Sequence, residues 1–307
     1  MSEQVNNLVT ALRFFIQISL ELVVLFIGIT FLVSLILQYV SPERVQSALK
    51  GKRLGLGNIV AAVFGGVTPF CSCSAVPMLM GLLELGVPFG VAMSFLIASP
   101  LGVFNPVVLS LFGTLLGRRV LVLYIVTTFI AAVLAGIILD ALGLAKYVKD
   151  VRIIGALQNS EKGGPVTLKE RIKTAAQNAV GLFRQMVPYL LVGVAIGSFI
   201  YGFVPASFLV RIAGPHNPFA IPVAAAIGVP LYVRTETMIP VGFAMIQKGV
   251  SVGAIMALTI GGAGASIPEL SMLAGVFKRR LWIAYIITMF LIATIIGYLF
   301  NFLVSAG

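Results

Sequence analysis

Long apolar runs determine the fold class of this chain. A helix of roughly 20 apolar residues can cross a bilayer, and these runs lack the polar stripe that a soluble helix keeps toward water. Only 10% of the residues are charged, against about 25% in soluble domains. The pattern predicts an all-α, multi-pass protein of the cell membrane with about eight hydrophobic segments. We place these segments at 14–40, 58–83, 88–112, 119–142, 179–204, 219–246, 251–276 and 281–304.

The net charge of +11 does not indicate nucleic-acid binding in such a protein. Basic loops that face the cytoplasm and its anionic lipids explain it, so membrane lipid is an expected partner and nucleic acid is not. The first apolar run follows no basic segment and has no small-residue cleavage site, so we expect no cleavable signal peptide. No His/Cys spacing resembles a zinc site, and we expect no cofactor. The oligomeric state is left open.

The chain repeats itself. A shift of 163 residues places Pro42 on Pro205 and Pro77 on Pro240, and a shift two residues shorter places Arg118-Arg119 on Arg279-Arg280. We therefore predict a first transmembrane repeat at 1–142, a cytoplasmic linker at 143–178 and a second transmembrane repeat at 179–307, an organisation found in many transporters.

The distribution of Lys and Arg favours inverted repeats. If one run in each copy enters and leaves by the same face, residues 42–53, the linker and 277–280 share one side with fourteen basic residues. The other side then has five, and cytoplasmic loops carry the excess of positive charge. The sequence does not identify which run is re-entrant. The five residues are Arg13, Arg118, Arg119, Arg211 and Lys248.

Helix-breaking residues recur at matching places in the two copies. "GGVTPFCSCSAVP" is matched by "IGVPLYVRTETMIP", and "IASPLGVFNP" is matched by "IGGAGASIPE". Proline removes a backbone donor and clashes with the preceding turn, and irregular backbone within a membrane needs protein or water to satisfy it. The four breaks predict discontinuous helices that meet at a central binding site.

The first of these breaks holds the only two cysteines, Cys71 and Cys73, which alternate with Ser72 and Ser74. A buried cysteine is usually an inert small apolar residue. Here, however, helix N-termini and a nearby Arg would lower the pKa of the thiols, and paired thiolates suit soft ions such as Cu(I) or trivalent arsenic. We predict that these four residues contact the cargo.

The second copy places charges at the positions of the thiols. The 163-residue shift aligns Cys71 with Arg234 and Cys73 with Glu236. Ionisable residues inside a membrane are costly and usually functional, although a mutually neutralising structural pair is the alternative. We predict Arg234, Glu236, Asn105 and Tyr232 as further cargo contacts. Glu236 and Glu269 are the candidate proton carriers, and Glu269 could instead satisfy the break beside it.

At these residues the chain resembles the ArsP-like predicted permease family, which includes organoarsenical efflux permeases and relatives linked to metal export. The resemblance covers nearly the whole chain and is most specific in "TPFCSCSAVP" and "GVPLYVRTETMIP". It implies that Cys71 and Cys73 contact a soft metal or metalloid cargo. Some relatives have a Cys where this chain has Arg234, so a three-thiolate arsenic site is not available here.

The sequence therefore predicts a secondary transporter, not an enzyme, that exports a small soft metal, metalloid or thiol-reactive species. No "GxxxxGK[ST]" nucleotide motif is present, so coupling to an ion gradient is expected. Two alternatives stay open. One is a membrane thiol–disulfide or electron relay that uses the Cys-Ser-Cys loop, and the other is a transporter of an anionic sulfur compound drawn by Arg234. Cargo identity, direction and coupling ion are not determined.

Overall fold

The structure, a computed structural model, describes residues 55–67, 72–149, 219–231, 235–247 and 249–305, with isolated positions between 16 and 35 and between 169 and 192. Within this part of the chain the structure is all helical, and the one β-contact is an isolated antiparallel bridge between Val148 and Phe277. The all-α class is confirmed. The expected segments 14–40 and 179–204 lie outside the described residues except at isolated positions, and so does most of the linker.

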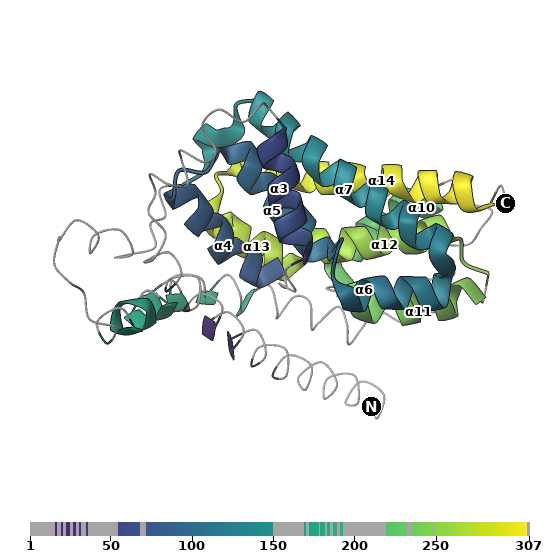
Figure 1. Ribbon diagram of the computed structural model, residues 1–307, viewed down its shortest axis with the longest axis horizontal. Helices are drawn as coiled ribbons and strands as arrows, with labels where there is room; N and C mark the ends of the chain where they lie inside the picture. Colours follow the sequence, from purple (N-terminus) through teal and green to yellow (C-terminus); the bar gives the residue numbers. More distant parts are fainter. Residues whose placement is uncertain are drawn as a thin grey trace, which may run out of the picture.

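The described helices form two series (Figure 1). The first series contains α3 (Leu56–Val67), α4 (Ser72–Glu84), α5 (Phe89–Leu101), α6 (Pro106–Leu111), the π-helix η1 (Phe112–Leu116), α7 (Gly117–Ala141) and the 3-10 helix η2 (Leu144–Tyr147). The second contains α10 (Ala220–Leu231), α11 (Thr235–Gln247), α12 (Val252–Gly264), α13 (Ile267–Val276) and α14 (Arg279–Ser305).

Most of these helices are too short to cross a bilayer alone. The helices α3, α4, α5, α10, α11 and α12 have 12 or 13 residues each, which corresponds to about 18–20 Å at 1.5 Å per residue. The hydrocarbon core of a bilayer is about 30 Å thick. Three described stretches are long and apolar enough to span it, namely Pro106–Ala141, Val252–Val276 and Arg279–Val304. The first of these contains a break in helical geometry at Gly117, where φ is +86°.

The two series have the same element bounds in their central parts. The helices α11 and α12 begin and end 163 positions after α4 and α5. The turns that precede α5 and α12 also match, because Val87 donates to the Leu82 carbonyl and Val250 donates to the Met245 carbonyl. The same local sequence signals therefore produce the same local structure twice.

Glycines bring α5 and α12 close to their neighbours. The helix α5 packs on α3 and α7, and α12 packs in the same way on α10 and α14. A Cβ atom at Gly65 would lie 2.7 Å from the Phe95 carbonyl oxygen, and one at Gly228 would press on the Leu258 carbonyl oxygen. Small residues allow backbones to approach in this way between membrane helices. In Val252–Val276, 89% of the most apolar 18-residue segment is buried, against 28% in Pro106–Ala141. Helices α12 and α13 therefore lie in the interior.

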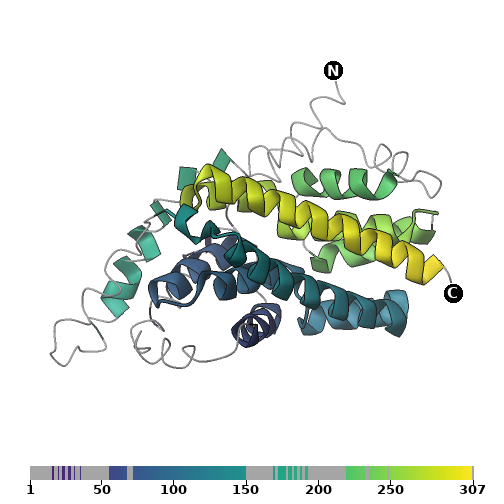
Figure 2. The same ribbon diagram turned by 90° about the horizontal axis from the view of Figure 1, so that it is seen from above.

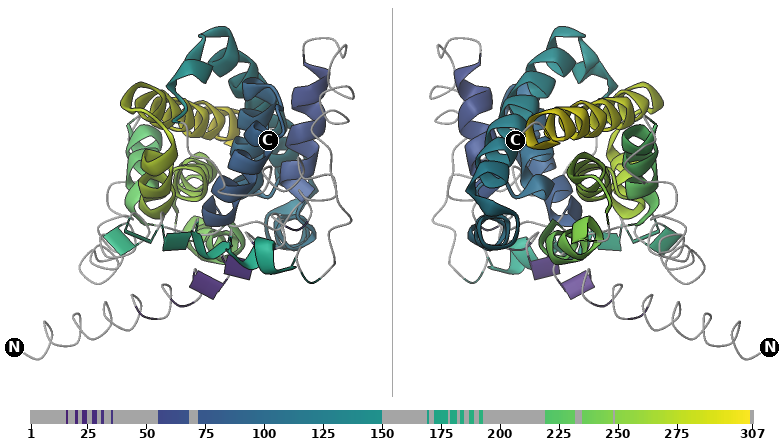
Figure 3. Two further views of the ribbon diagram at one scale, coloured as in Figure 1. Left: turned by 90° about the vertical axis from the view of Figure 1, so that its left-hand side faces the viewer. Right: turned by 90° about the vertical axis from the view of Figure 1, so that its right-hand side faces the viewer.

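The long helices α7 and α14 lie side by side and run in opposite directions (Figure 2). The chain that follows α7 lies against the start of α14, because Lys149 N donates to the Val276 carbonyl and Lys278 N donates to the Tyr147 carbonyl. Figure 3 shows the blue helices of the first series on one side and the green helices of the second on the other. Residues 146–149 and 277–280 are thus neighbours, which the count of basic residues predicts.

This shared end is strongly basic, and the Tyr147 ring lies among its charges. Arg280 donates a hydrogen bond of 2.7 Å to the Tyr147 hydroxyl, and Lys146 lies 5.4 Å from the centre of the same ring. The hydrogen bond from Arg280, supported by the charges of Arg280, Lys146 and Lys278, lowers the pKa of Tyr147 below its usual value. Basic residues at the end of two membrane helices are typical of a cytoplasmic face.

Candidate functional site

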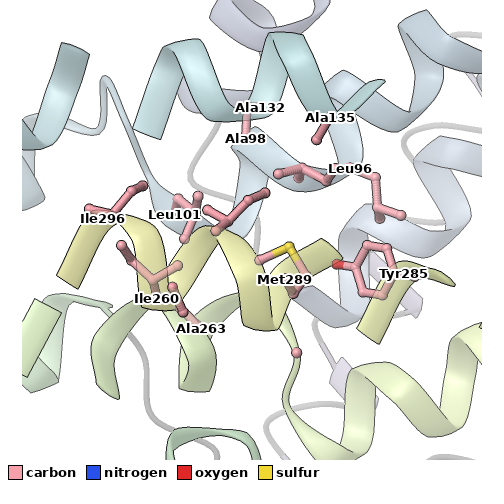
Figure 4. Packing of buried hydrophobic residues seen from close by; sticks show 14 of the residues in the cluster. Leu96, Ala98, Leu101, Ala132, Ala135, Ile260, Ala263, Tyr285, Met289 and Ile296 are labelled. Carbon is pink, nitrogen blue, oxygen red and sulfur yellow. The ribbon is translucent and has the colours of Figure 1, made fainter. Parts of the chain in front are cut away.

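The centre of the molecule is formed by the ends of short helices. The last turns of α5 and α12 come together, because a Cβ atom at Gly264 would lie 3.9 Å from Leu101 Cδ2. Figure 4 shows Leu101 from α5 near Ile260 and Ala263 from α12, with Met289 from α14 beside them. Helix α4 of the first series packs on α13 of the second, and α6 of the first packs on α11 of the second. Short helices of each series therefore contact the other series.

Tyrosine hydroxyls satisfy the C-terminal ends of α5 and α12. Tyr124 donates a hydrogen bond of 2.6 Å to the Leu101 carbonyl oxygen, and Tyr285 donates one of 2.8 Å to the Gly264 carbonyl oxygen. Both tyrosines are fully buried. The last carbonyls of a helix have no partner within it, so each break needs a donor from elsewhere, and the two series supply the same one.

The break between α5 and α6 is held by local hydrogen bonds. Gly102 adopts the left-handed conformation, with φ of +57°, which ends α5 at low cost. Asn105 is buried and caps α6, because its Oδ1 accepts a 2.9 Å hydrogen bond from Val107 N. The predicted cargo contact Asn105 therefore has a capping role in this structure.

The start of α11 is tied to the end of α5. Thr235 is the first residue of α11 and is buried, and its hydroxyl donates a hydrogen bond of 3.2 Å to the Pro100 carbonyl oxygen. This contact joins the second series to the first across the centre. It also places the N-terminal end of α11, where the helix dipole is positive, beside the C-terminal end of α5, where the dipole is negative.

Glu269 is the one predicted site residue whose acidic side chain the structure describes. It lies in the first turn of α13, is fully buried, and its Oε1 accepts a hydrogen bond of 3.0 Å from the Tyr285 hydroxyl. Ser266 precedes α13 as its N-cap residue, and Ser266 and Ser99 have buried hydroxyls for which the structure gives no hydrogen-bond partner. Glu269, Tyr285 and Ser266 thus surround the break between α12 and α13.

The remaining predicted site residues are only partly described. Cys71, Tyr232 and Arg234 lie outside the described residues. Ser72, Cys73 and Ser74 form the first turn of α4, and Glu236 lies in the first turn of α11, but their side chains are outside the described part. No group of three His, Cys, Asp or Glu residues that could hold a metal occurs among the described residues.

Comparison with known proteins identifies the family. A family model described as a predicted permease matches residues 7–302, nearly the whole chain. The chain belongs to the ArsP-like predicted permease family. Membership, together with helices long enough to span a membrane, makes the chain a membrane protein of the permease class, with a small-molecule cargo.

Three relatives of this permease are similar along most of their length. The UPF0718 protein MJ0584 of Methanocaldococcus jannaschii is 24% identical over 295 residues, which cover 78% of this chain and 80% of the relative. The UPF0718 protein YcgR of Bacillus subtilis is 26% identical, with 92% and 95% covered. A Streptococcus mutans protein, whose name describes it as a proposed subunit of a two-component membrane permease complex, is 26% identical, with 94% of each covered. No solved structure matches this permease significantly.

The shift of 161 residues that places Arg118-Arg119 on Arg279-Arg280 also places Tyr124 on Tyr285. This match is the sequence signal for their shared role at the ends of α5 and α12. Thr235 and Ser266 have no comparable signal, because a single hydroxyl beside a proline-bounded break does not indicate a role by itself.

Proposed function

We propose that this permease is a secondary transporter that exports a small soft metal, metalloid or thiol-reactive species through a site between two inverted repeats. The observation that carries the proposal is the meeting of short half-helices at the centre, where α5 and α12 end against each other. Discontinuous helices of this kind form the substrate and ion sites of transporters. Ion-gradient coupling, rather than a nucleotide motor, would drive export.

The inverted arrangement is supported by the direction of the helices. Residues 115–118 include the start of α7 and residues 277–280 include the start of α14, and these segments are equivalent in the proposed repeat. Because α7 and α14 are antiparallel neighbours (Figure 2), the two segments lie at opposite ends of the pair. Matching contacts at Tyr124 and Tyr285, and at Gly65 and Gly228, support the repeat itself.

The thiols would receive the cargo at the N-terminal end of α4. Cys73 lies in the first turn of this helix, where the positive end of the dipole stabilises a thiolate. A pair of thiolates from Cys71 and Cys73 would bind a soft ion in preference to a hard oxyanion. The cargo is a transient ligand in this proposal, and Arg234 and Glu236 would complete the site from the second repeat.

Proton coupling is assigned to Glu269 and Glu236. Glu269 has the stronger structural support, because it is fully buried beside the break between α12 and α13 and contacts Tyr285. A carboxyl group in this position can bind a proton on one side of the membrane and release it on the other only if the break rearranges. Glu236 lies in the first turn of α11, as Glu269 lies in the first turn of α13, and is the alternative carrier.

A sensitivity panel in the protein's own host tests this function. The host supplies any second subunit of the kind that the name of the Streptococcus mutans relative describes. Deletion of the gene should increase sensitivity to trivalent arsenicals or to soft metals such as Cu(I), with normal tolerance of phosphate-like oxyanions. Complementation with the wild-type gene should restore tolerance, and complementation with the Cys71→Ser variant should not.

The two alternative functions give different results in the same strains. A transporter of an anionic sulfur compound would leave metal sensitivity unchanged and alter accumulation of labelled thiosulfate. A thiol–disulfide relay would leave both unchanged, while thiol labelling of the purified protein would fall after treatment with oxidant. Unchanged sensitivity to every arsenical and soft metal would rule out the proposed cargo class.

A further inference from the structure

The Tyr285 hydroxyl lies between two oxygen acceptors. Its oxygen is 2.8 Å from the Gly264 carbonyl oxygen and 3.0 Å from Glu269 Oε1. All of this lies in the interior, because Tyr285 and Glu269 have no exposed surface. A phenol carries a single hydrogen, so Tyr285 can donate to only one of these two oxygens at a time.

The protonation state of Glu269 decides which acceptor receives that hydrogen. When Glu269 is protonated, its O–H donates to the Tyr285 oxygen, and Tyr285 donates to Gly264. When Glu269 is ionised, it has no hydrogen to donate and accepts more strongly than a neutral carbonyl, because charge-assisted hydrogen bonds are stronger. The Tyr285 hydrogen then turns to Glu269, and the Gly264 carbonyl loses its donor.

Loss of that donor acts on the end of α12. Gly264 is the last residue of α12, and its carbonyl has no partner within the helix. A carbonyl without a donor is costly away from water, so the helix end must shift until it reaches another donor. The Ser266 hydroxyl is a suitable one, because it is buried two residues further on and the structure gives it no hydrogen-bond partner.

The first series has the same tyrosine contact without the carboxyl group. Tyr124 donates to the Leu101 carbonyl at the end of α5, as Tyr285 does at the end of α12. The first turn of α6, which corresponds to that of α13, contains no acidic residue. Ionisation can therefore redirect the tyrosine hydrogen at the break in the second series, and the first series provides a natural control.

We propose that Tyr285 is a positioning residue that passes the protonation state of Glu269 to the C-terminal end of α12. Protonation holds the break closed against α5 and α14, and deprotonation releases it. This inference rests on the proposed function, in which Glu269 carries the coupling proton, and adds the step that converts proton binding into a movement of the central helix.

Few other ionisable groups face Glu269 from the described elements. Helix α13 packs on α4, α10 and α14, and of these α14 contributes Tyr285 while α10 has no titratable residue. Glu84 is at the opposite end of α4 from its break, and Lys149 donates to the Ala274 carbonyl, in the last turn of α13. The described charges therefore lie away from the contact, whereas the side chains of Cys73, Arg234 and Glu236 are outside the described part.

Hydrogen–deuterium exchange of the full-length protein in lipid nanodiscs tests the link. The readout is the exchange of amides in residues 258–268, compared between variants at the same pH so that the intrinsic pH dependence of exchange cancels. Glu269→Gln mimics the protonated acid, since its amide can donate to Tyr285. At alkaline pH, wild type should exchange about tenfold faster than Glu269→Gln, as expected for loss of a hydrogen bond to a buried group. At acidic pH the two should be equal.

Two tyrosine variants separate the proposed role from general packing. Tyr285→Phe should exchange fast in residues 258–268 at both pH values, because no hydroxyl remains to follow Glu269. Tyr124→Phe should loosen residues 96–102 but keep the pH response of residues 258–268. Equal exchange of wild type and Glu269→Gln at alkaline pH would overturn the proposal, and this comparison decides even if Tyr285→Phe does not fold.

Infrared spectroscopy distinguishes this failure from failure of proton coupling. The carboxyl stretching band that disappears in Glu269→Gln reports whether Glu269 titrates. If that band titrates while residues 258–268 do not respond, the link through Tyr285 is wrong and Glu269 can still carry the proton. If Glu269→Gln transports with the pH dependence of wild type, the proposed role of Glu269 is wrong, and Glu236→Gln becomes the next variant to measure.

Discussion

Cys71→Ser and Cys73→Ser should each reduce export of a soft cargo at least about tenfold, which corresponds to a loss of about 1.4 kcal/mol or more of transition-state stabilisation. Serine has nearly the same shape as cysteine but is a hard neutral oxygen donor, so it preserves packing and removes the soft thiolate. The measurement is the initial rate of arsenical or Cu(I) accumulation in everted membrane vesicles, normalised to the amount of folded protein.

The double variant tests whether the two thiols act together. If the two thiols bind one cargo as a unit, Cys71→Ser combined with Cys73→Ser should be little worse than either single variant, because effects within a unit are not additive. Equal thermal stability of the three variants would show that packing is intact. Wild-type rates in both single variants would assign the cysteines to packing, as is usual for buried cysteine.

Gly228→Ala should strongly destabilise the protein, by about 3 kcal/mol, at the upper end of the usual cost of overpacking. Its new methyl group would press on the Leu258 carbonyl oxygen of α12, which is backbone and cannot move aside like a flexible side chain. Gly65→Ala should behave similarly, because the same contact is made with Phe95 of α5. Thermal unfolding in detergent, followed by loss of the monodisperse peak, measures both.

Gly113→Ala is the matched control for these variants. A Cβ atom at Gly113 would lie 3.5 Å from Leu121 Cδ2, an ordinary contact. The higher helix propensity of alanine, worth about 1 kcal/mol, should make this variant neutral or slightly more stable. If Gly228→Ala were as stable as Gly113→Ala, the close approach of α10 and α12 would be wrong.

The sequence predicts the position of the breaks because prolines and glycines act locally. The breaks at "IASPLGVFNP" and "IGGAGASIPE" are confirmed, since α5 ends at Leu101 and α12 ends at Gly264. The prediction needs no knowledge of the tertiary fold, because a proline removes its own backbone donor wherever it lies. The matched bounds of α4 and α11 follow from the same local signals.

Hydropathy does not reveal which helices are central. All of the runs are strongly apolar, yet α5 and α12 are almost entirely buried whereas α7 and α14 expose residues such as Val126, Ile130, Ile287 and Leu291. The difference lies in residue size, because Gly, Ala and Ser in α5 and α12 permit close packing. The contact between Tyr285 and Glu269 joins residues 16 positions apart across a helix break, which no periodic pattern marks.

Sided labelling of introduced cysteines decides whether the two halves are inverted. Arg118→Cys, Lys146→Cys and Lys278→Cys, each in a cysteine-free variant that folds, place a thiol at exposed positions at the start of α7, in η2 and between α13 and α14. A membrane-impermeant thiol reagent applied to intact cells and to everted vesicles should label Lys278→Cys and Lys146→Cys from the same side, because these two positions are neighbours. Arg118→Cys should be labelled from the opposite side. Labelling of Arg118→Cys and Lys278→Cys from one side would contradict inverted repeats and leave a parallel repeat.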